Sequence, residues 1–319
     1  MTGSNEQLKI FSGRSNPALT DEICNYLETR PGRVHLETFP DGELFVKLHE
    51  DVRGRDVFVV QSTCRPVNDN LLELLVFIDC LRRASAKRIT AVLPYFGYAR
   101  QDRKDEGRVP ITAKLVSNLI TQAGADRVLT MDLHAAQIQG FFDIPVDHLE
   151  AAPVLMKHFK SSDPKNTVLV SPDVGNVKRA RGYAERMGCD LAIIDKRRTS
   201  GSTAVVNNII GNVEGKEVLM IDDMIATAGT LCEAARIVKE HGAKSVRGAA
   251  THAVLAGPAF ERLEKAPFTS ITVANTIPLT NEAAARLPGL TILSVAEILG
   301  EAIARIHKHQ SVSSLFVKS

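Results

Sequence analysis

The sequence predicts an α/β fold with two similar domains, each built on a mainly parallel sheet flanked by helices. Short runs of β-branched residues alternate with helical patterns along the chain, which is typical of strand–helix–strand units. One type of helix-to-strand connection recurs in both halves. A small residue and Ala end a helical pattern, and a pair of polar residues then leads into a strand of β-branched residues. It is found at residues 85–89, 124–128 and 242–246. The length of 319 residues also suits two domains better than a single core.

The domain boundary is expected near Asp147–Pro153, without a long linker. The first domain then covers residues 1–148 and the second residues 149–319, with a C-terminal tail that packs back on the first domain. The expected elements, in chain order, are a strand at Val57–Val60, a helix at Leu71–Arg83, strands at Val128–Leu129, Val168–Val170 and Val218–Ile221, a helix that carries Leu231 and Val238, and a helical tail over Ala283–Ile306.

The composition is that of an ordinary globular protein, with 44% apolar and 24% charged residues. The formal net charge of +2 argues against nucleic acid as the main partner, since proteins that bind it carry a strongly basic face. There is no apolar signal-peptide core, and no apolar run approaches the roughly 20 residues that span a bilayer. The five cysteines are scattered and form no CxxC pair. We therefore expect a reduced, cytoplasmic protein with no disulfide, no zinc site and no membrane partner.

Two adjacent acids and a small-residue turn follow the strand Val218–Ile221. Asp222 and Asp223 are expected to emerge at its carboxyl end, where ligands bind in parallel sheets. The turn Thr227-Ala228-Gly229-Thr230 leads into a helix, so its backbone N–H groups and the helix dipole suit a phosphate monoester. Carboxylates beside it can accept hydrogen bonds from sugar hydroxyls. The alternative is an Asp N-cap followed by an ordinary turn.

The segment Phe39-Pro40-Asp41-Gly42-Glu43 joins an aromatic residue to a turn with two acids. Pro40 and Gly42 favour a tight turn. Phe39 can stack on a flat ring, and the acids can accept hydrogen bonds from an amine. A plain surface turn is the alternative.

Residues 94–104, PYFGYARQDRK, place three aromatic residues before Arg100, Arg103 and Lys104. This order suits a stacking surface with cations directed at phosphate. A solvated loop and a nucleic-acid surface are the alternatives, and the second would need a wider basic field than this chain offers.

Two further strands each lead into a candidate metal ligand. His134 follows the strand Val128–Leu129, and Asp173 follows Val168–Val170. Magnesium takes few protein ligands and keeps water and phosphate oxygens, so one His and one Asp can suffice. A lone His is more often structural than a metal ligand.

A run of cations at Lys196-Arg197-Arg198 leads into a Gly/Ser-rich stretch, Thr199–Ser202. Charge runs are usually solvated faces, but a polar, glycine-containing stretch after a strand is also how a mobile lid is built. The sequence GNVEGKE at residues 211–217 is not a P-loop, because its glycine spacing is one residue short and Glu follows the Lys.

Taken in order, these segments resemble the ribose-phosphate pyrophosphokinase family of class I. The stretch from Val218 to Thr230 is similar to the phosphoribosyl-pyrophosphate loop of that family and of type I phosphoribosyltransferases, although the usual loop has an acid where this chain has Ala226. PYFGYARQDRK and the later PITAKL resemble the family's ATP-binding region, and QIQGFFDIPVDHL from Gln137 is similar as well. The resemblance covers nearly the whole chain and implies two phosphoribosyltransferase-like domains.

The resemblance also implies a reaction and roles for particular residues. The C1 hydroxyl of ribose 5-phosphate would attack the β-phosphorus of MgATP, so that the diphosphoryl group is transferred and AMP leaves. The implied residues are Phe39, Asp41, Gly42, Glu43, Arg100 and Gln101 for ATP; Arg198, Asp222, Asp223, Ala226, Thr227, Ala228, Gly229 and Thr230 for ribose 5-phosphate; His134 and Asp173 for Mg²⁺; and Lys196 and Arg198 for catalysis.

The family further implies a homohexamer built from dimers, in which the Phe39–Glu43 segment contributes to ATP binding across a subunit contact. It implies regulation by phosphate and ADP at subunit contacts, with the tail Ser311–Phe316 near that regulatory site. Three alternatives stay open: a plain phosphoribosyltransferase, a non-catalytic relative that regulates an active enzyme, and a nucleic-acid-binding protein.

Overall fold

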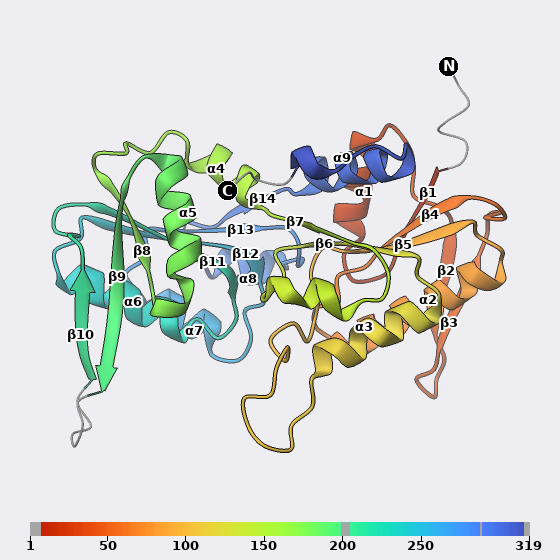
Figure 1. The fold of residues 1–319 in the computed structure, drawn as a ribbon, viewed down its shortest axis with the longest axis horizontal. Coiled ribbons are helices and arrows are strands. Elements are labelled where there is room, and N and C mark those ends of the chain that lie inside the picture. Colours follow the sequence, from red (N-terminus) through yellow and green to blue (C-terminus); the bar gives the residue numbers. More distant parts are fainter. Residues whose placement is uncertain (1–7, 199–204, 288, 316–319) are drawn as a thin grey trace. The chain divides into compact units, whose positions relative to one another are not determined.

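The computed structural model describes residues 8–198, 205–287 and 289–315, without the side chains of residues 174, 196–198 and 205–207 (Figure 1). The chain divides into two compact units. Unit 1 takes the chain up to Glu150, the short segment Thr276–Pro278 and the chain from Ser294 onward. Unit 2 takes Ala151–Asn275 and Leu279–Leu293. Unit 1 is therefore assembled from separate stretches of chain.

Unit 1 contains a five-stranded sheet in which all neighbouring strands are parallel. In spatial order its strands are β1 (Leu8–Ser12), β4 (Asp56–Val60), β5 (Arg88–Leu93), β6 (Arg127–Met131) and β7 (Val146–Leu149). Helices lie on both faces of this sheet (Figure 1). They are α1 (Pro17–Tyr26) and α9 (Ala296–His307) on one face, and α2 (Val67–Arg83) and α3 (Thr112–Ala123) on the other. Because both faces are covered, β4 is buried at every position.

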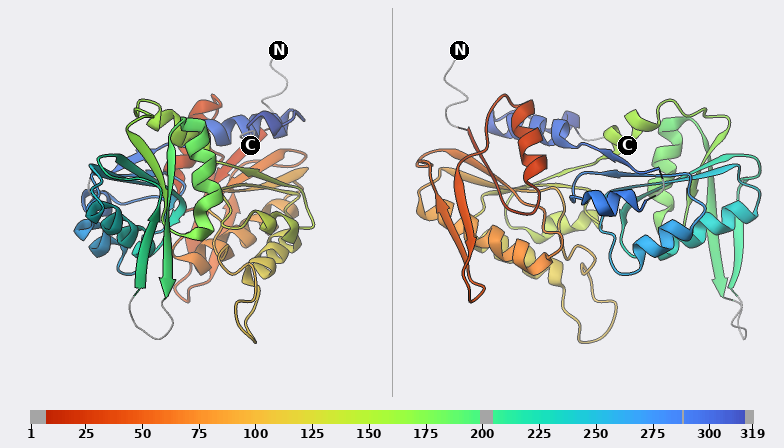
Figure 2. Two further views of the ribbon diagram at one scale, coloured as in Figure 1. Left: turned by 60° about the vertical axis from the view of Figure 1, so that its left-hand side comes forward. Right: turned by 180° about the vertical axis from the view of Figure 1, so that it is seen from behind.

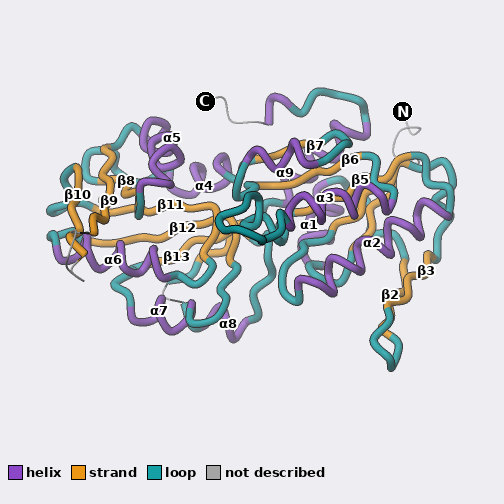
Figure 3. The backbone as a smooth tube through the Cα atoms, turned by 60° about the horizontal axis from the view of Figure 1, so that its bottom comes forward, coloured by secondary structure: helices purple, strands orange, loops and turns teal. Residues whose placement is uncertain are grey.

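A separate two-stranded antiparallel ribbon precedes β4 in the chain. It consists of β2 (Val34–Thr38) and β3 (Leu44–Leu48), and Thr38 pairs with Leu44 at its end. Alternate residues of the ribbon pack on the core of unit 1, as the period of a strand requires. In Figure 3 the ribbon runs away from the five-stranded sheet, so its hairpin loop lies apart from the strands of that sheet.

Unit 2 contains a seven-stranded sheet that is parallel except at one edge. In spatial order its strands are β10 (Val205–Ile210), β9 (Asp190–Arg198), β8 (Thr167–Ser171), β11 (Glu217–Ile225), β12 (Ser245–Ala253), β13 (Ser270–Ala274) and β14 (Thr291–Leu293). Only β9 and β10 pair antiparallel. The predicted fold class, two mainly parallel sheets flanked by helices, is confirmed.

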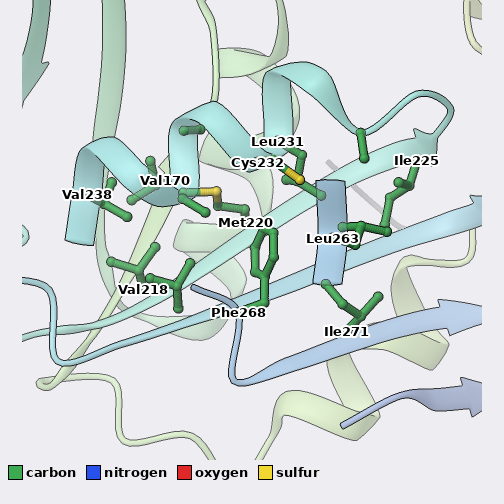
Figure 4. Packing of buried hydrophobic residues seen from close by; sticks show 14 of the residues in the cluster. Val170, Val218, Met220, Ile225, Leu231, Cys232, Val238, Leu263, Phe268 and Ile271 are labelled. Atoms are coloured by element: carbon green, nitrogen blue, oxygen red, sulfur yellow. The ribbon is translucent and has the colours of Figure 1, made fainter. Parts of the chain in front are cut away.

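The core of unit 2 lies between the sheet and two helices, α6 (Gly229–Glu240) and α7 (Ala259–Lys265). Figure 4 shows Met220 of β11 and Phe268 packed beneath Leu231 of α6, with Leu263 of α7 alongside. These side chains are buried. The remaining helices of the unit are α4 (Ala152–Phe159), α5 (Val177–Met187) and α8 (Asn281–Ala285). None of the helices in the described part of the chain has both the length and the apolar character needed to cross a membrane.

Two expectations for individual elements are wrong. The tail Ala283–Ile306 is not one helix, because α8 ends at Ala285 and β14 adds a parallel strand to β13 before α9 begins. The sequence Pro288-Gly289 explains the break, since neither residue continues a helix well. The helix expected at Leu71–Arg83 exists, but the expectation that it is apolar nearly all round and therefore buried is wrong, because Leu72 is 52% exposed on its outer side.

A buried cluster of charged side chains fastens α9 to the sheet of unit 1. Asp56, at the start of β4, is 8% exposed. Its Oδ1 accepts a hydrogen bond from Arg88 Nε at 2.8 Å, and its Oδ2 lies 2.7 Å from His307 Nδ1. Arg88 Nη2 also donates to the carbonyl of Ile306 at 3.0 Å. The last helix of the chain is thereby tied to the first two inner strands.

We expect Asp56→Ala to destabilise unit 1 by about 3 kcal/mol, because it leaves the partly buried charge of Arg88 without its carboxylate partner. The measurement is the melting temperature, which should fall by several degrees. Asp79→Ala is the matched control, since Asp79 pairs with Arg83 at an exposed site on α2 and should change stability little. Equal effects of the two substitutions would contradict a structural role for the Asp56 cluster.

Candidate functional site

The sheet of unit 2 has a topological switch point beside β8, which pairs with β9 on one side and β11 on the other. Ligands bind at such points, outside the carboxyl ends of the strands. Here β8 and β11 pair only from Thr167–Glu217 to Leu169–Leu219. Beyond Leu219 the second half of β11 keeps β12 as its only partner in the described sheet. The segments after β8 and β11 therefore separate at the place where a ligand is expected.

Asp222 and Asp223 lie inside β11 and not beyond it, because the strand continues to Ile225. This corrects the expectation that they emerge after the strand ends at Ile221; pairing with β12 extends the strand through Asp222↔Ala250 to Ile225↔Ala253. Asp223 is buried, with 5% exposure. Its backbone N–H donates to Asp222 Oδ1 at 2.8 Å.

Burial and the neighbouring Asp223 carboxyl raise the pKa of Asp222 from its ordinary 3.8 to about 7. One cation opposes this: Arg179 of α5 lowers the pKa of Asp222, and its Nη2 lies 4.0 Å from Asp223 Oδ1. The two carboxyl groups are thus held close together, and Asp222 loses its proton only near neutral pH.

The turn after β11 has the features of an anion site. Thr227 and Thr230 are exposed, Ala228 is buried, and α6 begins at Gly229. Ala228 adopts a left-handed conformation with φ of 58°, which turns the chain sharply into the helix. The carbonyl of Ala226 accepts a hydrogen bond from Ala256 N at 2.9 Å. The methyl side chain of Ala226 offers no acceptor, so the acidic groups beside this turn are Asp222 and Asp223.

Asp173 lies directly after β8, at the side of the switch point opposite the β11 acids. Its Oδ1 accepts from Asn176 N at 3.0 Å and so begins a short 3₁₀ helix, η3 (Val174–Asn176). The side chain of Asn176 donates to the carbonyl of Ile221 at 3.0 Å. Pairing between β8 and β11 has ended before Ile221, so this bond gives the Ile221 carbonyl a partner. It also ties the Asp173 loop to β11.

Lys196 and Arg198 lie on β9, where their backbones face Asn207 and Val205 of β10. Only Asp190–Ile193 of β9 pairs with β8, so the cationic end of β9 continues past β8 as a two-stranded arm (Figure 2). The side chains of both cations lie outside the described part of the chain, and so do Thr199–Ser202. Their roles therefore remain predictions.

In unit 1, Phe39, Asp41, Gly42 and Glu43 form the loop of the β2–β3 hairpin. Phe39 N donates to the carbonyl of Glu43 at 2.8 Å, and Glu43 N donates to Asp41 Oδ1 at 3.1 Å. Gly42 has φ of 95°, which favours glycine. Phe39 is 38% exposed and stacks beside Phe45, with ring centroids 5.5 Å apart. The loop thus offers an aromatic face and two carboxylates.

Arg100 and Gln101 lie on the long loop between β5 and α3, and both are exposed. One side-chain atom of Gln101 is already hydrogen-bonded within the protein: Oε1 accepts from Thr112 Oγ1 at 2.5 Å, at the start of α3. The next residue, Asp102, accepts from Gln137 Nε2 at 2.9 Å. This bond joins the Arg100 loop to the segment after β6.

His134 lies in that segment, two residues after Asp132 with φ of 39°, and its side chain is exposed. Asp132 N donates to the carbonyl of Leu149 at 2.9 Å, and Leu133 N donates to His148 Nε2 at 2.8 Å. Two hydrogen bonds to β7 therefore fix the backbone that presents His134. Unit 1 brings Arg100, Gln101 and His134 to the carboxyl edge of its sheet.

Sequence reasoning missed a buried carboxylate that supports the hairpin. Glu73 of α2 is 2% exposed and accepts from Gln61 Nε2 at 3.0 Å and from Arg14 N at 2.7 Å. The Arg14 side chain pairs with Glu73 and donates through Nη1 to Thr38 Oγ1 at 3.0 Å. Thr38 directly precedes Phe39. An acid on the apolar face of a helix was the available signal, since such a group is rarely buried without partners.

The geometry supports two kinds of binding. In unit 2, a phosphate group suits the turn at the start of α6, and the adjacent acids suit sugar hydroxyls. In unit 1, the hairpin offers an aromatic face with acceptors, and the sheet edge offers a guanidinium and an imidazole. Among the described residues no group of three or more His, Cys, Asp or Glu could hold a metal ion. A divalent ion would therefore need oxygen atoms from a ligand.

Comparisons with known proteins give one family. Residues 8–124 match the N-terminal domain of ribose phosphate pyrophosphokinase, and residues 204–317 match the phosphoribosyl synthetase-associated domain. The ribose-phosphate pyrophosphokinase of Rhodopirellula baltica is 64% identical over 97% of this chain and 98% of its own length. That of Synechococcus elongatus is 56% identical over 98% of this chain and 94% of its own. The crystal structure of phosphoribosylpyrophosphate synthetase from Mycobacterium smegmatis has a TM-score of 0.89 at 43% identity, covering 95% of this chain and 99% of that one.

The raised pKa of Asp222 predicts a pH-dependent effect of Asp222→Asn. Between pH 4 and 7 the folded protein holds a proton that the unfolded chain has lost, so stability falls as pH rises, and the full cost is present above pH 7. Asn cannot ionise and avoids this cost. We expect the variant to melt at least ~3 °C higher than wild type at pH 8, with the difference vanishing near pH 4. Asp190→Asn, on the exposed start of β9, is the control. A difference that is constant with pH would contradict the raised pKa of Asp222.

Proposed function

The chain belongs to the ribose-phosphate pyrophosphokinase family, and from this premise we infer that it transfers the β,γ-diphosphoryl group of ATP to the C1 hydroxyl of ribose 5-phosphate. The products are phosphoribosyl pyrophosphate and AMP. The observation that carries this proposal is the pair of adjacent acids on β11, half-buried Asp222 and buried Asp223, which a small-residue turn into α6 follows. That arrangement suits a sugar phosphate as acceptor.

On unit 2, the turn Thr227–Thr230 binds the 5-phosphate through its backbone N–H groups and threonine hydroxyls. Asp222 and Asp223 accept hydrogen bonds from the ribose hydroxyls. Ala226 contributes its backbone and no carboxylate, so sugar orientation depends on the two β11 acids. Because Asp222 keeps its proton up to near neutral pH, hydroxyl groups that donate to its carboxylate favour release of that proton.

On unit 1, the adenine ring stacks on Phe39, and Asp41 and Glu43 accept from its amine. Gly42 gives the loop its sharp turn. Arg100 binds the phosphate chain. Gln101 binds ATP through its side-chain amide nitrogen, since its oxygen accepts a hydrogen bond from Thr112. The Glu73–Arg14 pair supports the base of the hairpin through Thr38 and so favours a fixed position for Phe39.

His134 and Asp173 are the proposed ligands of Mg²⁺ carried by ATP. Each residue follows a strand of its own unit, and an imidazole or a carboxylate suits an ion that keeps phosphate oxygens and water. When bound, the ion would neutralise charge on the triphosphate. Asp173 retains one carboxylate oxygen for this purpose, since Oδ1 accepts from Asn176.

Charge is the main obstacle to the reaction. Two like unit charges about 4 Å apart repel by roughly 4 kcal/mol at an effective dielectric near 20, and both substrates carry several. Lys196, Arg198 and Arg100 are the cations that offset this repulsion. We assign Lys196 and Arg198 to the transferred phosphates, where charge develops in the transition state.

Assembly, regulation and location follow the family resemblance as proposals. We propose a homohexamer regulated by phosphate and ADP. The tail proposed for the regulatory site includes Ser311 and Ser313, whereas Phe316 lies outside the described residues. A cytoplasmic location is supported by the five cysteines, none of which forms a disulfide.

The decisive experiment is AMP formation from ATP, with and without ribose 5-phosphate, in magnesium and phosphate buffer. We expect AMP only when the sugar phosphate is present, with an equal amount of phosphoribosyl pyrophosphate. No AMP from folded protein that binds ATP would overturn the proposal in favour of a regulatory, non-catalytic relative. AMP without dependence on the sugar phosphate would indicate a different acceptor.

Lys196→Ala should lower kcat at least ~100-fold while the KM for ATP changes less than ~3-fold, because the lost contact is made mainly in the transition state. Steady-state kinetics with both substrates varied gives the two constants. Lys244→Ala removes the same charge from the start of β12, at the opposite edge of the sheet, and serves as control. Equal losses in kcat and ATP affinity would contradict the assigned role.

A further inference from the structure

We infer that Arg262 of α7 is a positioning residue of the ribose-5-phosphate loop, defined here as Ala226–Thr230. The inference rests on the proposed function, since it concerns how that loop is held ready for the 5-phosphate. Arg262 lies 32 residues after the loop in sequence, and no motif in the sequence links the two.

The loop carbonyls are held by one segment behind them. The carbonyls of Ile225 and Ala226 accept from the backbone N–H groups of Leu255 and Ala256, each at 2.9 Å. The carbonyl of Thr227 accepts from Arg262 Nη1 at 2.9 Å. Three consecutive carbonyls are therefore fixed by residues 255–262, and the third depends on a side chain.

The loop N–H groups remain available in the same region. Within the described part of the chain, the backbone N–H groups of Ala228, Gly229 and Thr230 have no hydrogen-bond partner. A carbonyl that rotated among these donors would repel a bound phosphate. Because Arg262 fixes the Thr227 carbonyl, this acceptor is kept away from the loop N–H groups. Arg262 also adds a positive charge beside the start of α6.

Arg262 also explains the glycine at position 229. A Cβ atom on Gly229 would lie 3.1 Å from Arg262 Nη1 and 4.0 Å from Thr227 Oγ1. Gly229 has no left-handed φ, so the backbone itself would accept alanine. The Arg262 guanidinium is the group nearest to the added methyl, so it is the group that the methyl would displace. The Arg262 guanidinium thus lies against the loop at two points, the Thr227 carbonyl and the space beside Gly229.

The chain provides a matched control in Arg236 of α6. Arg236 and Arg262 both lower the pKa of the Cys232 thiol, against the larger rise caused by burial, so both cations lie near the first turns of α6. Arg236 is exposed and has no hydrogen bond to the loop in the described structure. Loss of either residue removes one positive charge from this region, and only loss of Arg262 removes the bond to Thr227.

The test is steady-state kinetics of R262Q, R262K and R236Q with both substrates varied. We expect R262Q to raise the KM for ribose 5-phosphate about 10-fold, the equivalent of losing one charged hydrogen bond, with the KM for ATP within ~2-fold of wild type. R262K should raise the KM for ribose 5-phosphate less, by about 3-fold, and R236Q should leave it within ~2-fold of wild type. Melting temperatures identify any variant that fails to fold; if R262Q does, R262K carries the test.

A double-mutant cycle with G229A separates positioning from a simple loss of charge. G229A alone should raise the KM for ribose 5-phosphate because the methyl displaces the guanidinium. In the R262Q background the same substitution should have at most about one third of that effect. Additive effects, or equal effects of R262Q and R236Q, would overturn the inference and leave the proposed function intact. A wild-type enzyme that forms no AMP would overturn both.

Discussion

The early end of pairing between β8 and β11 is the constraint on which the proposed acceptor site depends. After Leu219 the strand β11 has lost one neighbour, yet it stays extended because β12 still pairs with it as far as Ile225. The unpaired side allows the Asp173 loop to approach, and Asn176 satisfies the exposed carbonyl of Ile221. The strand that carries the two acids is therefore paired on one side only beyond Leu219. Full pairing on both sides would have placed a neighbouring strand where the Asp173 loop now lies beside β11.

Much of this was predictable from the sequence, and the failures have a common cause. Periodicity gave the α/β class, because strands covered on both faces are continuously apolar and parallel sheets require helical crossovers. The continuation of β11 past Ile221 was not predictable, since it depends on pairing with β12. Glu73, Arg14 and Arg262 were missed for a similar reason: each acts through a contact with a residue distant in sequence. Lys196 and Arg198 stay predictions, because their side chains lie outside the described structure.

The two units hold their acidic groups in opposite ways. In unit 2 the acids proposed to bind the sugar are removed from solvent themselves, Asp223 buried and Asp222 half-buried, and the cost is seen in the raised pKa of Asp222. In unit 1 the hairpin acids Asp41 and Glu43 are exposed, and the buried carboxylate is Glu73, which binds its partners and supports the hairpin from behind. Burial changes the proton affinity of a ligand-binding group in the first case. In the second it gives rigidity to a loop whose own residues remain solvated.

The nesting of unit 2 within the chain of unit 1 has a consequence for biosynthesis. The sheet of unit 1 is encoded before residue 150, but α9, which packs with α1 and binds Asp56 through His307, is encoded after unit 2. During translation the ribosome must produce all of unit 2 before that helix emerges. The nascent chain therefore carries an incomplete first unit, with the apolar surface under α9 uncovered, until α9 itself has been synthesised. Truncated or stalled products would keep that surface exposed, which gives chaperones and proteases a feature that distinguishes them from the finished protein.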